Sequence, residues 1–134
     1  MRAYRRARPT AHSHEPGAWL AHISETDRGR FRQLGMALVR SLLAYLDADK
    51  EHEATLLETA ERQAREYGFQ AVNAGASLSD TVQGFLRFRR PLIDELAVLA
   101  RRRRLDTREA TDLLIQAESA LDRLLVALML GHKA

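Results

Sequence analysis

Histidine and carboxylate side chains stand close together at two places in the sequence, and this combination could bind a metal ion. Asp49 and His52 are three residues apart, and His12, His14 and Glu15 lie together near the amino terminus. Carboxylate-bridged metal sites in helical bundles draw ligands from several helices and use a second such motif, but the sequence offers only one. A helix N-cap beside a surface histidine is the simpler interpretation of Asp49 and His52. We therefore predict no metal site.

Other catalytic residue patterns are missing from the sequence. The 134-residue chain has no cysteine, which excludes thiolate nucleophiles and thiolate metal ligands. We find no serine nucleophile motif with a partnered histidine, and no glycine-rich loop of the type that binds phosphates. His22 and His132 are isolated, and nothing around either suggests haem. We predict that the chain is not an enzyme and has no cofactor.

Arginine and aromatic residues gather between residues 65 and 92. Arg89 lies on the apolar stripe of a predicted helix, and a buried guanidinium needs a carboxylate or carbonyl partner. A structural ion pair is the favoured interpretation of Arg89, and an anion or effector site is the alternative. The candidate ligand-binding residues for that alternative are Tyr67, Gln70, Arg87, Arg89 and Arg90.

The same segment carries a resemblance to a known type of domain. Gly75, Ser77 and Leu78 form a G-x-S-L turn, and an aromatic and arginine-rich helix with Phe85, Phe88, Arg89 and Arg90 follows. In these features the chain, over about residues 25 to 130, resembles the N-terminal sensory domains of RsbR/RsbRD-like stress-response co-antagonists. Similar segments occur in some histidine kinases and PucR-type transcription regulators.

The resemblance implies a dimeric helical sensor that transmits a signal to a regulatory protein partner or an output module. Some members are globin-like without haem. We recognise no output module in this sequence, and in this respect we expect the chain to depart from the pattern. The resemblance itself implies a role in signal transduction, stress response and transcription regulation in a bacterial cytoplasm. The sequence does not identify the effector.

Apolar residues recur at spacings of three and four, which is typical of amphipathic helices. We expect helices over about 24–47 and 49–73, one from Ser77 to the Arg101–Arg104 run, one from Asp106 to just before Gly131, and a short helix through Trp19, Leu20 and Ile23. Ser24, Asp49, Ser77 and Asp106 are the expected N-caps, and Gly131 fits a position just past a helix end. The fold class is all-α, a four- to five-helix bundle.

Two features of these helices carry further expectations. Pro91 interrupts the predicted helix that begins at Ser77, and we expect a kink or a junction of two helices there. The last helix is so apolar from Leu121 to Leu130 that it must be central to the core or to a subunit interface. We expect a homodimer whose interface uses Leu121, Leu124, Leu125 and Leu128.

Basic residues form two clusters in an otherwise acidic chain. Each cluster consists of four arginines. The formal net charge is +3, but when these eight arginines are left out, the chain has 13 basic and 18 acidic residues. A nucleic-acid-binding protein is the alternative function that these clusters suggest, although such domains more often carry a continuous basic face. The candidate residues are Arg2, Arg5, Arg6, Arg8, Arg101, Arg102, Arg103 and Arg104.

The domain organisation follows from length and pattern. Residues 1–15 lack a helical period and are predicted to be a flexible basic arm or linker, whereas 16–134 form a single helical domain. No apolar run has the length of a membrane span, so we expect no membrane association and a cytoplasmic location. A third function, a small-molecule carrier or enzyme with a pocket near Arg89, has only the arginine and tyrosine grouping in its support.

Overall fold

The computed structural model describes residues 24–133, and within this range it is made of helices and turns without strands. The helices are α1 (Glu25–Leu46), α2 (Glu53–Asn73), α3 (Leu78–Arg102) and α4 (Thr107–Lys133). The predicted all-α fold is confirmed. The expected short helix through Trp19, Leu20 and Ile23 and the arm over 1–15 lie outside the described residues.

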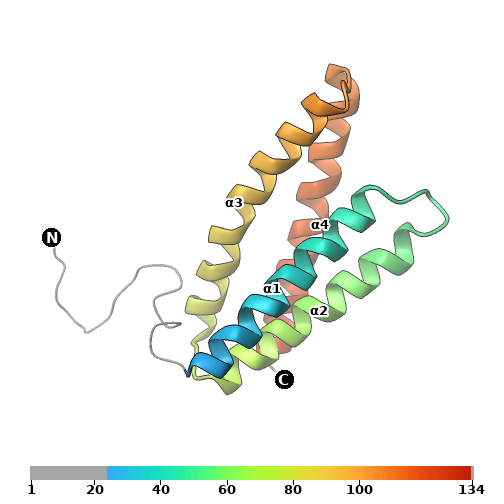
Figure 1. The fold of residues 1–134 in the computed structure, drawn as a ribbon. Helices are drawn as coiled ribbons and strands as arrows, with labels where there is room; N and C mark the ends of the chain where they lie inside the picture. Colours follow the sequence, from blue (N-terminus) through green and yellow to red (C-terminus); the bar gives the residue numbers. More distant parts are fainter. Residues whose placement is uncertain (1–23, 134) are drawn as a thin grey trace, which may run out of the picture.

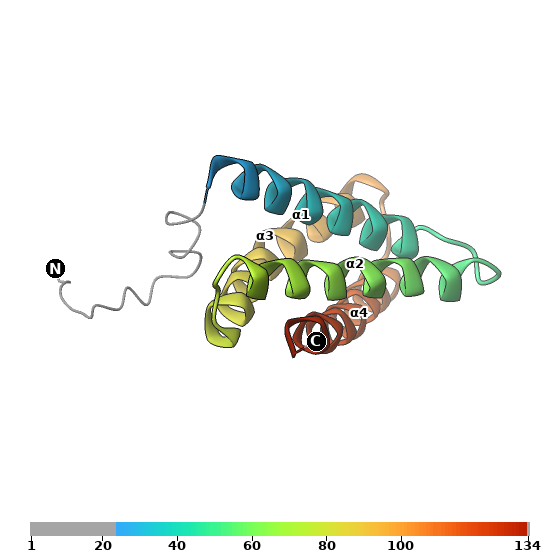
Figure 2. The same ribbon diagram turned by 90° about the horizontal axis from the view of Figure 1, so that it is seen from below.

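The four helices form two antiparallel hairpins. Helices α1 and α2 lie side by side, and the hairpin of α3 and α4 crosses them obliquely (Figure 1). Viewed from below, α2 lies between α1 and the carboxyl-terminal end of α4 (Figure 2). The main contact between the hairpins is that of α2 with α4, whereas α1 and α3 have little direct contact.

Local side-chain caps begin three of the helices as the sequence predicts. Ser24 Oγ accepts a hydrogen bond from the Asp27 amide at 3.1 Å. Ser77 and Asp80 cap each other's backbone amides at the start of α3. Before α4, the Asp106 amide donates to Glu109 Oε1 at 3.0 Å and the Glu109 amide donates to Asp106 Oδ1 at 2.8 Å. These caps satisfy amides that have no partner within the helix.

The start of α2 differs from the prediction. The N-cap is His52, not Asp49, and the helix begins at Glu53. Asp49 Oδ1 instead accepts from the His52 backbone amide at 3.2 Å and lies 2.7 Å from its ring Nδ1. The Asp49 side chain is therefore used in the turn that precedes the helix.

Helix α3 is one helix with Pro91 inside it, so the expected alternative of two helices meeting there is wrong. Proline removes the amide that would donate to the carbonyl of Arg87. Both residues are exposed. The helix nevertheless continues through the proline to Arg102.

The core lies at the crossing of α2 and α4, where small residues let the two backbones approach. A side chain at Gly68 would overlap the carbonyl oxygen of Leu128, and one at Gly131 would overlap the carbonyl oxygen of Arg65. The prediction that Gly131 follows the helix end is thus wrong, because α4 continues to Lys133 and Gly131 is needed at the crossing. The small residues of this seam are Ala60, Ala64, Gly68 and Ala71 in α2, and Ala117, Ala120, Ala127 and Gly131 in α4.

Helices α2 and α3 end in the same motif but with different residues at its left-handed position. In both, the second residue after the C-cap donates back to the last turn, from Ala76 to Ala71 O and from Leu105 to Ala100 O, each at 3.0 Å. The residue between has positive φ, 92° for Gly75 and 55° for Arg104. A left-handed conformation costs an L-residue about 1–2 kcal/mol, a cost that glycine avoids.

Replacing Arg104 with glycine is therefore expected to raise the free energy of unfolding by about 0.5–1 kcal/mol, since the greater freedom of glycine in the unfolded chain offsets part of the relief. Denaturant unfolding monitored by circular dichroism measures this. Gly75→Arg is the matched reverse change and should lower stability by a similar amount. Equal stability of Arg104→Gly and the parent chain would contradict the left-handed assignment.

Candidate functional site

An apolar groove runs between α1 and α3, where the two hairpins diverge. Its volume is about 250 Å³. Helices α1 and α3 form its walls, with Tyr67 of α2 and Leu128 of α4 completing it. The lining residues are Phe31, Arg32, Gly35, Met36, Leu38, Val39, Tyr67, Gly84, Phe85, Phe88 and Leu128.

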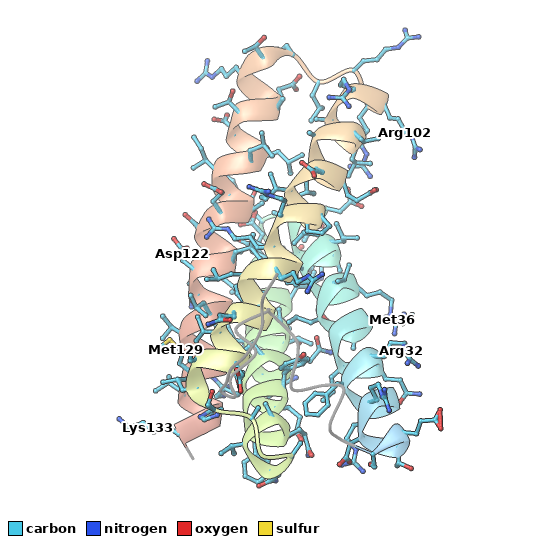
Figure 3. The ribbon with its side chains drawn as sticks, turned by 90° about the vertical axis from the view of Figure 1, so that its left-hand side faces the viewer. Arg32, Met36, Arg102, Asp122, Met129 and Lys133 are labelled. Carbon is cyan, nitrogen blue, oxygen red and sulfur yellow. The ribbon has the colours of Figure 1, made fainter. Side chains whose placement is uncertain are left out.

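Glycines keep the groove open. Gly35 in one wall and Gly84 in the other have nothing within 4 Å of where a Cβ atom would lie. Beside them Met36 is 52% exposed, although it is a large apolar residue. Figure 3 shows Arg32 and Met36 projecting from the same side of α1.

Aromatic contacts stiffen the groove lining. The rings of Phe31 and Tyr67 pack edge to face with centroids 5.3 Å apart, and those of Phe85 and Phe88 are 5.7 Å apart. Burial raises the pKa of the Tyr67 hydroxyl above its usual value of 10.0, because a phenolate would lose its hydration. With Arg32 as the one charged residue of the lining, the groove suits an apolar occupant rather than acid–base chemistry.

The structure does not bring the predicted ligand-binding residues together. Tyr67 lines the groove, but the Gln70 side chain donates to Glu66 Oε2 at 2.7 Å and accepts from Arg30 at 3.3 Å. Arg89 and Arg90 line a separate shallow pocket with Leu86, Ile93 and Asp94. Arg87 is exposed on α3 and is not part of either lining.

Arg89 is half-buried and pairs with Glu118 of α4. Its Nη2 atom lies 3.0 Å from Glu118 Oε1. This contact joins the two helices of the second hairpin. The structural ion pair is the favoured sequence interpretation of Arg89, and it is confirmed.

Three of the four predicted interface leucines are wrong as a contact surface. Leu121 and Leu124 are 0% exposed and Leu128 is 1% exposed, while Leu125 is half-buried and packs against the core. The side chains of Leu121, Leu124 and Leu128 fill the interior of a single chain, so a second chain cannot reach them. Helix α4 is apolar as predicted, but these three leucines lie on the side of the helix that faces the core.

A second stripe of α4 faces outward. Ile115, Ser119, Asp122, Val126, Met129 and Lys133 are all exposed and follow one another at alternating spacings of four and three residues. We call this stripe the outer face of α4. Val126 is 57% exposed and Leu130 beside it is 55% exposed. Figure 3 shows Asp122, Met129 and Lys133 along one edge of the helix.

A shallow hollow extends the outer face of α4 towards α3. It has a volume of about 400 Å³, and its lining includes Leu78, Val126, Met129 and Leu130. The sequence signal for this surface is present, since Val126 and Met129 continue the spacing that begins at Ile115. It is masked by the stronger leucine stripe on the other side of the helix.

The described basic cluster lies at the tip where α3 meets α4. Arg101, Arg102, Arg103 and Arg104 are exposed, and Figure 3 shows Arg102 at this tip. Arg103 pairs with Asp47 at 2.8 Å, which neutralises part of the local charge. The other predicted nucleic-acid residues, Arg2, Arg5, Arg6 and Arg8, lie outside the described residues.

Two histidines have structural partners. Asp49, Glu51 and His52 have their ligand atoms within 4.8 Å of one another, but all three are exposed, and the contact of Asp49 with His52 belongs to the turn before α2. His132 Nε2 lies 3.0 Å from the carbonyl oxygen of Ala76, which ties the end of α4 to the turn between α2 and α3. His12, His14, Glu15 and His22 lie outside the described residues.

Comparisons with known proteins leave the chain without relatives to guide its function. No protein-family model, curated protein or solved structure matches it. The resemblance to RsbR-like sensory domains therefore stays a prediction from the sequence. Over residues 24–133, none of the helices has the length and apolar character needed to cross a membrane.

Proposed function

We propose that this chain is a non-catalytic regulatory domain that acts as a homodimer and passes a signal to a protein partner or output module. The observation that carries the proposal is the outer face of α4, where the exposed apolar side chains of Val126 and Met129 lie next to that of Leu130. Contiguous exposed apolar surface is typical of interaction sites. The sequence resemblance to dimeric helical sensors supports the regulatory role.

The outer face of α4 is complementary to a second copy of itself. Its alternating spacing of four and three residues is that of the seam between paired helices. If two α4 helices pack antiparallel about a twofold axis between residues 127 and 128, Val126 faces the partner's Met129 and Asp122 faces the partner's Lys133. Apolar groups then meet at the centre and opposite charges at both ends, as an interface between identical surfaces requires.

The groove is joined to this surface through α4. Leu128 lines the groove and is fully buried, and it is followed directly by Met129 of the outer face. A change of the groove occupant therefore acts on the helix that would form the interface. We propose a sensory role on this basis, and a cytoplasmic location in keeping with the lack of cysteine in the sequence.

Light scattering after size-exclusion chromatography tests the proposal. We expect a dimer for the parent chain and a monomer for Val126→Glu/Met129→Glu, with dissociation favoured about 100-fold or more because four carboxylates are brought into the interface. Leu43→Glu/Leu86→Glu is the matched control: it places the same charges on exposed apolar positions of α1 and α3 and should remain a dimer. A monomeric parent chain at high micromolar concentration contradicts the proposal.

The antiparallel register has its own check within this experiment. Asp122→Lys alone should weaken the dimer several-fold, because two like-charged pairs replace two opposite ones. Adding Lys133→Asp should restore the affinity. A double variant as weak as the single one would show that Asp122 does not face the partner's Lys133.

A further inference from the structure

We propose that the groove between α1 and α3 is the docking site of the chain's own segment 17–23, with the Trp19 side chain held between the two walls. These residues lie outside the described part of the chain. The inference rests on the groove and on the sequence before α1. It does not depend on the proposed dimer.

The lining of the groove is an apolar surface that the four helices leave exposed to solvent. Its walls carry Met36, Val39 and Phe88, and only the exposed Arg32 among its lining residues is charged. Helices α1 and α3 leave this surface open because they have little direct contact. Leaving apolar side chains in water costs about 25 cal/mol for each Å² that could be buried.

Segment 17–23 is within reach of this surface. Helix α1 begins at Glu25, and the helical rise puts Phe31 about 9 Å and Met36 about 16 Å along it. Trp19 stands six positions before Glu25, and an extended chain of that length spans up to about 20 Å. If the chain turns back at Ser24, Trp19 can therefore reach the part of the α1 wall from Phe31 to about Met36.

The segment also has matching chemistry. Trp19, Leu20 and Ile23 place three large apolar side chains directly before α1, and Trp19 is the one tryptophan of the chain. Phe88, which lines the groove and is half-buried, offers its ring to an indole. The guanidinium of Arg32 at the rim can stack on its face.

This occupant gives the groove a means of regulation. Any apolar ligand of the groove would have to displace Trp19, and displacement would release the segment that links α1 to the arginine-rich residues 2–8. The affinity for such a ligand would be lowered by the fraction of chains in which the groove is already filled.

Tryptophan fluorescence of the full chain tests the proposal, because its signal comes from Trp19 alone. We expect a blue-shifted emission and a several-fold lower acrylamide quenching constant than in concentrated guanidinium chloride. Gly84→Leu, which adds a side chain inside the groove where the backbone leaves room, should shift the emission to the red and raise quenching. Gln83→Leu adds the same side chain one residue earlier, outside the groove lining, and should change neither.

A second measurement keeps the proposal testable if Gly84→Leu perturbs folding. Trp19→Ala should bind the apolar dye ANS more strongly than the parent chain while circular dichroism stays native, because the groove is uncovered. Quenching of native Trp19 equal to that of the unfolded chain would overturn the proposal. So would equal emission in the Gly84→Leu and Gln83→Leu variants, or burial of Trp19 that is lost on dilution, which would assign the segment to the groove of a second copy.

Discussion

Replacing Gly68 with alanine is expected to lower the free energy of unfolding by about 3 kcal/mol or more, near the upper end of overpacking effects. The added Cβ atom would overlap the carbonyl oxygen of Leu128 and lie 2.8 Å from the backbone nitrogen of His132. Both obstacles are backbone atoms of α4, so no side-chain rotation can relieve them. The two helices must separate, and the packing of the whole seam is weakened with them.

Chemical denaturation of Gly68→Ala and the parent chain measures this loss. Gly29→Ala is the matched control, because Gly29 lies inside α1 with nothing within 4 Å of its missing Cβ. That control should gain about 0.5–1 kcal/mol from the better helix propensity of alanine. If Gly68→Ala gained stability as Gly29→Ala does, the close crossing of α2 and α4 would be refuted.

Features that depend on a few neighbouring residues could be predicted from the sequence. The caps at Ser24, Ser77 and Asp106 could be predicted because a cap is formed by residues at most three positions apart. The all-α fold followed from apolar spacing. The favoured ion pair of Arg89 followed from the cost of burying a guanidinium without a partner.

Features that depend on how helices are placed relative to one another could not be predicted. Gly131 fits a helix end by its type, but its position is set by Arg65 of a different helix. Helix α4 carries apolar residues on two sides, and periodicity alone does not say which side meets α2. The groove exists because α1 and α3 diverge, and no local pattern near Gly35 or Gly84 encodes that divergence.

Replacing Leu124 with alanine is expected to lower the free energy of unfolding by about 2–5 kcal/mol, the range for a leucine removed from a closed core. Leu124 is 0% exposed and belongs to the main core cluster. The measurement is best made in the Val126→Glu/Met129→Glu background, where unfolding does not depend on protein concentration. Leu130→Ala in the same background is the control, since an exposed position should change stability by no more than about 0.5 kcal/mol.

The same leucine decides between the two sides of α4. If Leu124 were at a subunit interface, Leu124→Ala would dissociate the dimer and leave a monomer as stable as that of the interface variant. If Leu124 fills the core, the substitution destabilises the monomer itself, and the dimer persists wherever the chain remains folded. Val126 is only two residues away but lies on the opposite side of the helix, and it should give the reverse pattern. The two substitutions together therefore fix the rotation of α4 about its axis, on which both the core and the proposed interface depend.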